Sequence, residues 1–246
     1  MAKQTGLGDN LYVGGYNVSG DINAIGSVHG GNSPIDVTDI TQSAISRIGG
    51  KRDGGITFTA LFNPDTGRAH PVLSALPTAD TQVMYCRGTT VGGPGAALVA
   101  KQLNYDGTRA DDGSFTFAVE AQANGYGLEW GVQLTAGLRT DTAATNGTGV
   151  DLTDTSTTFG WQAYLQVFSV TGTSVTVKIQ DSADNSTFAD LSGASFTAAT
   201  GPGWQRTQAS SGTATVRRYV RVVTSGTFSN AQFAVLFVRN ASEVTF

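Results

Sequence analysis

The last third of the chain carries one β-strand pattern after another, with no helical pattern between them. Within residues 174–180, the apolar side chains Val175, Val177 and Ile179 alternate with polar ones, which is the period of two expected for a strand with one buried face. Strand-like runs occupy residues 161–170, 174–180, 216–223 and 233–239. These short, closely spaced strands predict a β-sandwich of either the immunoglobulin-like or the jelly-roll type.

Strand patterns also dominate the first part of the chain. Residues 11–18 and 21–28 are rich in β-forming side chains and predict a hairpin that turns at Ser19-Gly20. Further runs, separated by turn-forming residues, cover residues 56–62, 82–87, 96–105, 114–122 and 129–138. A short helical turn is predicted at residues 70–77, because prolines bracket it at both ends.

One segment of the first part shows a helical pattern. Its apolar residues fall at helical spacing, Thr38 or Asp39 can cap its start, and Gly49-Gly50 can end it. A short amphipathic helix is one interpretation, and a loop that becomes ordered only on a partner would carry the same residues. The apolar positions are Val37, Ile40, Ala44, Ile45 and Ile48.

Residues 139–158 contain only two large apolar side chains, Val150 and Leu152. Such a stretch adds little to a core, so we place a boundary there between two domains, residues 1–145 and 146–246. The predicted fold class is mainly β. An N-terminal barrel or sandwich with a short helix is followed by the C-terminal sandwich.

The composition indicates folded β-structure with a surface poor in charge. Glycine makes up 32 of the 246 residues without a collagen-like period, which indicates many turns between short strands. Only 14% of the residues are charged, against about 25% in a typical domain. Such a surface is easily buried against copies of the same chain, although a robust extracellular β-protein would have the same composition.

The single cysteine, Cys86, cannot form a disulfide within the chain and lies in an apolar run, so we expect a buried, reduced thiol. The N-terminus has no apolar signal segment, and no run approaches the ~18 apolar residues that a membrane span needs. We therefore expect synthesis as a soluble cytoplasmic protein without membrane insertion.

No residue pattern points to catalysis, to a cofactor or to a metal site. The two histidines, His29 and His70, lack partners at any catalytic or zinc-binding spacing. The acidic loop at residues 181–187 lacks the spacing of a calcium loop and predicts a turn held by side-chain hydrogen bonds. Asp111-Asp112 precedes a glycine, which predicts a solvated turn and not a catalytic carboxylate pair. We expect no enzyme activity.

The charges are unevenly distributed. Residues 1–150 contain 9 basic and 13 acidic side chains, a net charge of −4, whereas residues 151–246 contain 6 of each. An acidic domain is a poor surface for nucleic acid, because affinity for phosphates depends on Lys and Arg. The arginines at residues 217–221 fall on both faces of a strand, so they predict ion pairs within the sheet or with a neighbouring subunit.

Four segments together resemble a known family. Residues 35–56, Phe62-Asn63-Pro64, residues 126–131 and residues 216–222 are similar to segments of the tail tube (major tail) proteins of long-tailed, non-contractile bacteriophages that have an appended C-terminal β-sandwich domain. The resemblance implies a structural virion protein that polymerises as stacked hexameric rings, whose inner strands form a continuous barrel of the tail-tube type. It also implies an acidic lumen through which DNA passes during ejection without specific binding.

The resemblance further implies partners and residue roles. The homo-oligomeric rings would meet a tape measure protein and tail terminator or tip proteins, in a phage tail synthesised in the host cytoplasm. The second domain would decorate the tube and could touch host-surface glycans. Residues expected at contacts between rings or subunits are Ile40, Ile45, Ile48, Lys51 and Arg52. Residues expected to face the lumen are Asp111, Asp112 and Glu120.

Two other classes of protein fit the same composition. A capsid or tail decoration protein would share the β-structure without forming rings of its own. A carbohydrate-binding adhesin module would instead expose Trp161, Trp204 and Tyr219 as residues that stack on sugars. Each of these three side chains also fits packing within a core or at its rim.

Overall fold

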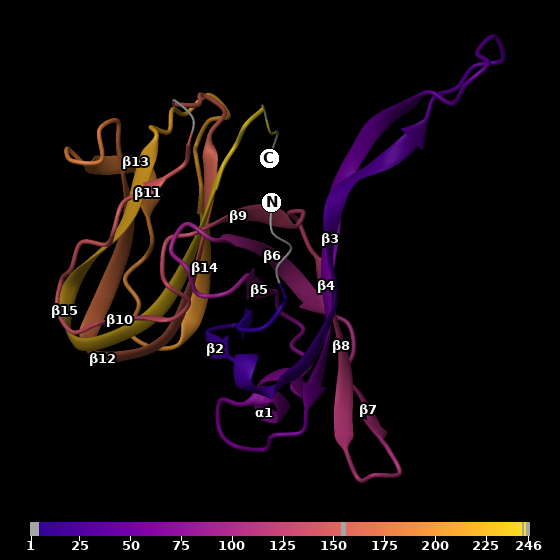
Figure 1. Cartoon of the computed structure of the whole chain (residues 1–246), viewed down its shortest axis with the longest axis horizontal. Coiled ribbons are helices and arrows are strands. Elements are labelled where there is room, and N and C mark those ends of the chain that lie inside the picture. The colour runs from indigo at the N-terminus through magenta and orange to yellow at the C-terminus, as the bar shows by residue number, and fades with distance from the viewer. Residues whose placement is uncertain (1–4, 154–155, 243, 245–246) are drawn as a thin grey trace.

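The computed structural model describes residues 5–153, 156–242 and 244, and β-strands dominate their structure (Figure 1). The mainly β fold class predicted from the sequence is confirmed. Strand pairing runs through the chain in the order β13-β12-β15-β9-β6-β5-β1-β2, and the other strands join this path. The N-terminal elements are β1 (Asn10–Val13), β2 (Tyr16–Asn17), η1 (Ser19–Asp21), β3 (Ile22–Asp36), β4 (Arg47–Leu61), α1 (Ala69–Leu73), β5 (Thr81–Cys86), β6 (Pro94–Gln102), β7 (Asp106–Arg109) and β8 (Phe115–Ala123). The later elements are β9 (Glu129–Gln133), β10 (Arg139–Asp141), β11 (Val150–Asp151), β12 (Trp161–Ser182), β13 (Ala189–Ser195), β14 (Gly203–Gln208) and β15 (Tyr219–Arg239).

The N-terminal unit, β1 to β8, has an apolar core between two layers of strands. β1, β5 and β6 pair in one layer, and β3, β4 and β8 pair in the other. Alternate residues point into the core, as Ile56, Phe58 and Ala60 of β4 do. The helix α1 adds Ala69 and Leu73 to this core, which confirms the helical turn predicted beside the prolines.

The C-terminal unit is built on two long strands, β12 and β15. They pair antiparallel along almost their whole length and curve around one core (Figure 1). β13 and β14 pair with β12, and β10 and β11 pair with β15. The runs at residues 161–170 and 174–180, which look like separate strands in the sequence, are the two halves of β12. Register shifts near Gly172 mark the point where the strand bends.

A third core lies between the two units. Tyr12 and Met84 of the N-terminal unit pack with Tyr164 and Leu236 of the C-terminal unit. Cys86 belongs to the same core as a free thiol, and burial raises its pKa to about 12. The sheet of β1, β5 and β6 is therefore covered on both faces.

The strand β9 connects the two units, because it pairs with β6 on one side and with β15 on the other. β10 also pairs with β15, although residues 139–141 lie in the first of the two predicted domains. The boundary at residues 145 and 146 stays a prediction.

The amphipathic helix predicted between residues 37 and 48 is wrong. β3 ends at Asp36, β4 begins at Arg47, and the residues between them form the connecting loop. Ile35 and Ile48 lie opposite each other across the ribbon, a pairing that suits β-branched side chains. Because these residues are exposed, no core is available against which a helix could bury an apolar face.

The first hairpin also differs from the prediction. It turns at Gly14 and Gly15, whose φ angles are 59° and 92°, and the segment at Ser19-Gly20 is the short helix η1. Positive φ angles are readily adopted only by glycine, so this pair of glycines determines where β1 turns back.

Candidate assembly surface

Four antiparallel strands, β3, β4, β8 and β7, form a sheet whose outer edges on β3 and β7 are unpaired in the described part of the chain, while the end of β8 beyond β7 pairs with β6. β4 pairs with β3 on one side and with β8 on the other, and β7 pairs with β8. Among the described residues, no strand pairs with the outer edge of β3 or with the outer edge of β7. Unpaired edges are templates on which another chain can add a strand. This sheet can therefore continue from one copy of the chain to the next.

The two faces of this sheet differ in polarity. One face packs on the N-terminal core through residues such as Ile56 and Val119. The other, which we call the polar face, presents small and polar side chains, and the hydroxyls of Ser27 and Thr57 lie 2.9 Å apart on it. The carboxylate of Glu120 forms none of the ion pairs found among the described residues. The exposed or half-buried residues of β4 and β8 on this face are Thr57, Thr59, Leu61, Thr116, Ala118, Glu120 and Gln122, of which Leu61 is the one large apolar side chain.

Beyond the sheet, β3 and β4 continue as a two-stranded ribbon that projects from the body of the molecule (Figure 1). We call residues 31–53 the arm. An isolated ribbon of two strands is marginally stable in water, and exposed aliphatic side chains at its end mark a surface for a partner. The exposed fractions are 104% for Ile40, 60% for Ile45, 54% for Ile48 and 48% for Ile35.

The arm tip, residues 37–46, is an ordered turn. The Asp39 carboxylate accepts hydrogen bonds from the backbone N–H and the hydroxyl of Thr41, at 2.8 and 2.5 Å. The hydroxyl of Thr38 accepts the Ser46 N–H at 2.9 Å and closes the loop. The hydrogen bond from the Thr41 hydroxyl holds the pKa of Asp39 below its usual value. Local hydrogen bonds, and not packing, therefore set the shape in which the tip presents its isoleucines.

Leu128 packs against the base of the arm. A Cβ atom at Gly30 would lie 2.8 Å from the Cβ of Leu128, and one at Gly54 would lie 2.6 Å from it. Leu128 is 6% exposed and belongs to the N-terminal core. Two glycines at this level thus allow the ribbon to approach the core closely, which fixes the direction in which the arm leaves the body.

Arg52 of the arm, Glu129 of β9 and Arg206 of β14 form a buried ionic cluster. Arg52 Nη2 lies 3.1 Å from Glu129 Oε1, and Arg206 Nη2 lies 3.4 Å from Glu129 Oε2. The Tyr164 hydroxyl donates a hydrogen bond to the same carboxylate, and the Arg206 guanidinium lies 3.8 Å from the centroid of the Tyr126 ring. The Glu129 and Arg206 side chains are only 2% and 5% exposed. Arg52, which the resemblance assigns to contacts between rings or subunits, is thus engaged in its own chain and ties the arm to the C-terminal unit.

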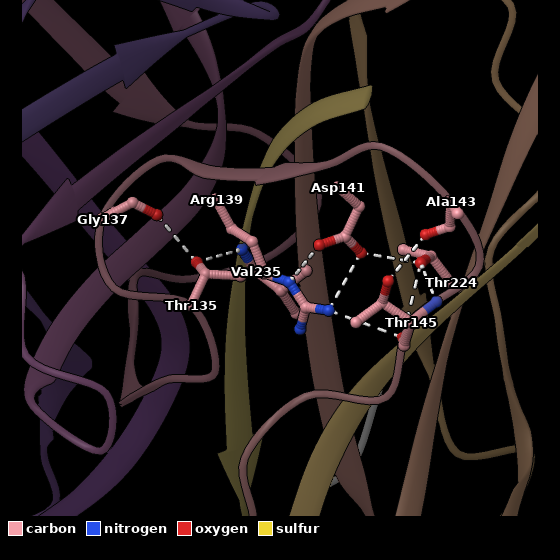
Figure 2. Close-up of polar contacts among 8 residues, drawn as sticks. All are labelled: Thr135, Gly137, Arg139, Asp141, Ala143, Thr145, Thr224 and Val235. Carbon is pink, nitrogen blue, oxygen red and sulfur yellow. Dashed lines mark hydrogen bonds and ion pairs between the residues drawn. The ribbon is translucent and has the colours of Figure 1, made fainter. Parts of the chain in front are cut away.

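A second polar network fastens the segment that joins the two units (Figure 2). Arg139 and Asp141 form a bidentate ion pair, with 2.7 Å between Nε and Oδ1 and 2.9 Å between Nη2 and Oδ2. The hydroxyl of Thr224 on β15 donates to Asp141 Oδ2 at 2.7 Å and accepts the Thr145 N–H at 3.1 Å. These groups satisfy one another, so the network holds the connecting segment against β15.

The two arginines just before β15 are paired within the protein, as the sequence predicts. Arg217 lies 2.5 Å from Asp181, and Arg218 lies 2.7 Å from Asp151. The hydrogen bond from Arg218 is the main reason why the pKa of Asp151 falls to about 2. The Arg218 side chain is 42% exposed, so this pair lies at the surface.

The three aromatic residues considered for sugar binding do not form one platform. Trp161 is 0% exposed in the C-terminal core, so the expectation of a stacking residue there is wrong. Trp204 is half-buried against the core between the units, and Tyr219 begins β15. The most exposed tryptophan is Trp130 of β9, at 52%. No sequence signal distinguishes it from a buried tryptophan, because both stand in strands of the same pattern.

Asp111 and Asp112 lie in the exposed turn between β7 and β8, at one end of the sheet that carries Glu120. The Ser114 N–H donates a hydrogen bond to Asp112 and holds its pKa below the usual value. Lys51 is exposed on the arm. A lumenal position for the three carboxylates stays a prediction.

His70 and the acidic loop at residues 181–187, for which the sequence predicts no catalytic or metal-binding role, form local contacts. His70 Nδ1 lies 3.1 Å from the Tyr105 hydroxyl. In the loop at residues 181–187, Asp184 accepts the N–H groups of Ser186 and Thr187, which is the hydrogen-bonded turn predicted there. No group of three His, Cys, Asp or Glu side chains that could hold a metal ion occurs in the described parts of the chain. Within the same parts, no helix is long and apolar enough to cross a membrane.

No family model matches the sequence, and no curated protein matches it. Among solved structures, the chain is similar to the Dit (gp 19.1) protein of phage SPP1, a paradigm of the hub adsorption apparatus in phages that infect Gram-positive bacteria. The identity is 9%, the match covers 94% of this chain and 98% of that chain, and the TM-score is 0.34. The chain is also similar to chains of the phage p2 baseplate in its activated conformation with Sr and with Ca. Both are 11% identical, with 96% of this chain and 99% of that chain covered, and the TM-scores are 0.34 and 0.28. At these TM-scores the similarity assigns no function to this chain.

Proposed function

We propose that this chain is a structural virion protein that polymerises as stacked hexameric rings into a phage tail tube. The observation that supports the proposal best is a sheet with two unpaired edges, on β3 and β7, joined to an arm with an exposed apolar tip. Free edges suit lateral closure into a ring, and a projecting arm suits contact between rings. The proposed role is structural and not catalytic.

Ring closure would pair β7 of one copy with the outer edge of β3 in the next. Because these two edges are different, the contact is heterologous, and a heterologous contact closes into a ring when the rotation between copies allows it. The closed barrel would remove sheet edges that otherwise promote aggregation. The number of six subunits comes from the resemblance of the sequence to tail tube proteins.

The polar face would line the lumen of such a ring, because the other face of the sheet is covered by the core. The polar face carries the Glu120 carboxylate, and the turn with Asp111 and Asp112 lies at its end. DNA phosphates would find little positive charge there and would pass during ejection without specific binding. We therefore propose an acidic conduit.

Stacking would use the arm, with Ile40, Ile45, Ile48 and Lys51 in contact with the adjacent ring. Arg52 is not part of this proposed contact, because its partner is Glu129 of the same chain. The C-terminal unit would lie on the outside of the tube. The tape measure protein in the lumen and the terminator and tip proteins at the tube ends are the further partners that the resemblance implies.

Negative-stain electron microscopy across a concentration series tests this function. Hollow tubes or stacked rings are expected at high concentration. A chain that stays monomeric or trimeric at every concentration would contradict the proposal and leave the decoration protein as the alternative. Host-surface glycans are not proposed as partners, since Trp161 is buried.

Two neighbouring proline variants test the role of the β7 edge. Successive N–H groups of a strand point to opposite sides, so one of Thr108→Pro and Arg109→Pro removes an outward N–H and the other removes a bond to β8. The outward variant should keep its melting temperature and lose assembly, while the inward variant should lose stability. Tubes formed by both folded variants would argue against ring closure through β7.

A further inference from the structure

Five rings gather at the surface where β4 and β8 extend past the N-terminal core. Phe62 and Phe115 are 43% and 38% exposed, and their ring centroids lie 5.6 Å apart. Tyr105 and Phe117 stack with centroids 4.1 Å apart, and the ring of His70 lies 4.8 Å from that of Phe62. We call Phe62, His70, Tyr105, Phe115 and Phe117 the aromatic patch.

The aromatic patch has the properties of a docking surface. Soluble proteins rarely expose contiguous apolar groups except where a partner binds, and aromatic side chains are enriched at the centres of interfaces. The contacts among the rings already fix their orientations, so the loss of side-chain entropy on binding a partner would be small. The patch is therefore suited to an apolar partner, which it can bind without rearranging its side chains.

The arm tip is a complementary surface on the same chain. Figure 1 shows the arm leaving one end of the N-terminal unit, while β7, the start of β8 and α1 lie at the opposite end. The arm, residues 31–53, carries three basic and three acidic side chains, a net charge of zero, and Asp39 is the one charged residue of its tip. Residues 103–120, which include part of the patch, carry one basic and four acidic side chains, a net charge of −3. The arm tip and the patch are therefore matched by their exposed apolar groups and by their places at opposite ends of the unit, and not by charge.

We propose that the aromatic patch is the acceptor for the arm tip of a second copy, with Ile40 and Ile45 seated against Phe62 and Phe115. This inference rests on the proposed function and names the surface that the arm contacts within the stack. Because tip and patch are different surfaces at opposite ends, each copy binds one neighbour through its tip and another through its patch. Such a contact repeats along an axis and adds ring upon ring.

Two complementary variants test the pairing. Ile40→Asp/Ile45→Asp disables the tip, Phe115→Asp disables the patch, and Leu7→Asp changes an 86% exposed apolar side chain outside both surfaces as the matched control. Wild type and control should form tubes, while each test variant should need at least about tenfold more protein to assemble. Mixing rings of the two test variants should restore one junction, because each supplies the surface that the other lacks. The product should be paired rings that cannot elongate.

Disulfide cross-linking checks the same contact without added charge and covers the case in which an aspartate variant does not fold. The Ile40→Cys, Phe115→Cys pair should give a ladder of cross-linked chains on oxidation of tubes, and the Ile40→Cys, Leu7→Cys pair should not. The native thiol of Cys86 is buried and should not interfere.

The outcomes separate this inference from the proposed function. Wild-type tubes without the cross-link, together with folded aspartate variants that assemble at wild-type concentrations, would overturn the docking contact and leave the tube function standing. A wild type that forms neither rings nor tubes would overturn both.

Discussion

Replacing Glu129 by glutamine removes the negative charge from the buried ionic cluster and keeps the size of the side chain. Arg206, whose side chain is 5% exposed, would keep its positive charge between Tyr126 and Tyr164 without a counter-charge. Breaking a buried ion pair by removing one partner costs about 3–5 kcal/mol. Arg52 adds little, because its side chain is 34% exposed and exposed pairs contribute at most about 1 kcal/mol. We expect the free energy of unfolding to fall by about 3 kcal/mol.

Urea denaturation followed by far-ultraviolet circular dichroism measures this loss. For a chain of this size, the same loss lowers the melting temperature by about 6–12 °C. The matched control is Glu120→Gln, an exposed carboxylate outside the ion pairs found among the described residues, for which we expect a change within about 0.5 kcal/mol. A Glu129→Met/Arg206→Met double variant should recover only part of the loss, because it removes the unpaired charge but takes both of these partners from the buried Tyr164 hydroxyl. A loss below about 1 kcal/mol in Glu129→Gln would refute the reasoning.

Surface and core side chains give three further tests. Arg218→Ala should lower stability only slightly because its pair with Asp151 is exposed. The stabilisation is present above pH 3.8 and is lost as the pH falls through about 2, and an NMR titration should show the pKa of Asp151 returning toward 3.8 in the variant. The Cys86 thiol, with a pKa of about 12, should resist alkylation at neutral pH until urea unfolds the chain, and rapid labelling of the native protein would contradict its burial. Neutralising Asp111 and Asp112 to asparagine should leave the melting temperature within about 2 °C while altering genome passage, and unaltered infectivity would count against a lumenal role.

The strands of both units could be predicted because alternation of apolar and polar residues is a local signal. It is sufficient for β8 and for residues 56–61 of β4, where alternate residues enter a core, whereas β5 and β6 are apolar runs buried on both faces. It cannot show that residues 161–170 and 174–180 belong to one strand, β12, or that the runs at 216–223 and 233–239 fall in one strand, β15. The register shifts near Gly172 depend on how these two long strands pair with each other. Pairing over such distances is tertiary information.

The helix predicted in the arm is wrong for a related reason. The spacing of Val37, Ile40 and Ile48 fits a helix, but a helix of this length needs a core against its apolar side, and the arm projects from the body (Figure 1). The ionic cluster was invisible in the sequence because Arg52, Glu129 and Arg206 lie on three strands far apart in the chain. Nothing local to any of the three indicates that they meet.

The sheet of β1, β5 and β6 contributes to two cores, because one of its faces packs on the N-terminal core and the other packs against the C-terminal unit. Removing the C-terminal unit would expose Tyr12, Met84 and Val99 together, a patch that soluble proteins rarely leave in contact with water. The C-terminal unit is thus part of what keeps the N-terminal unit folded and soluble. A variant that lacks the C-terminal unit would need polar replacements for the side chains of β1, β5 and β6 that face it. Cleavage of the connecting segment should leave two fragments that remain associated through this core.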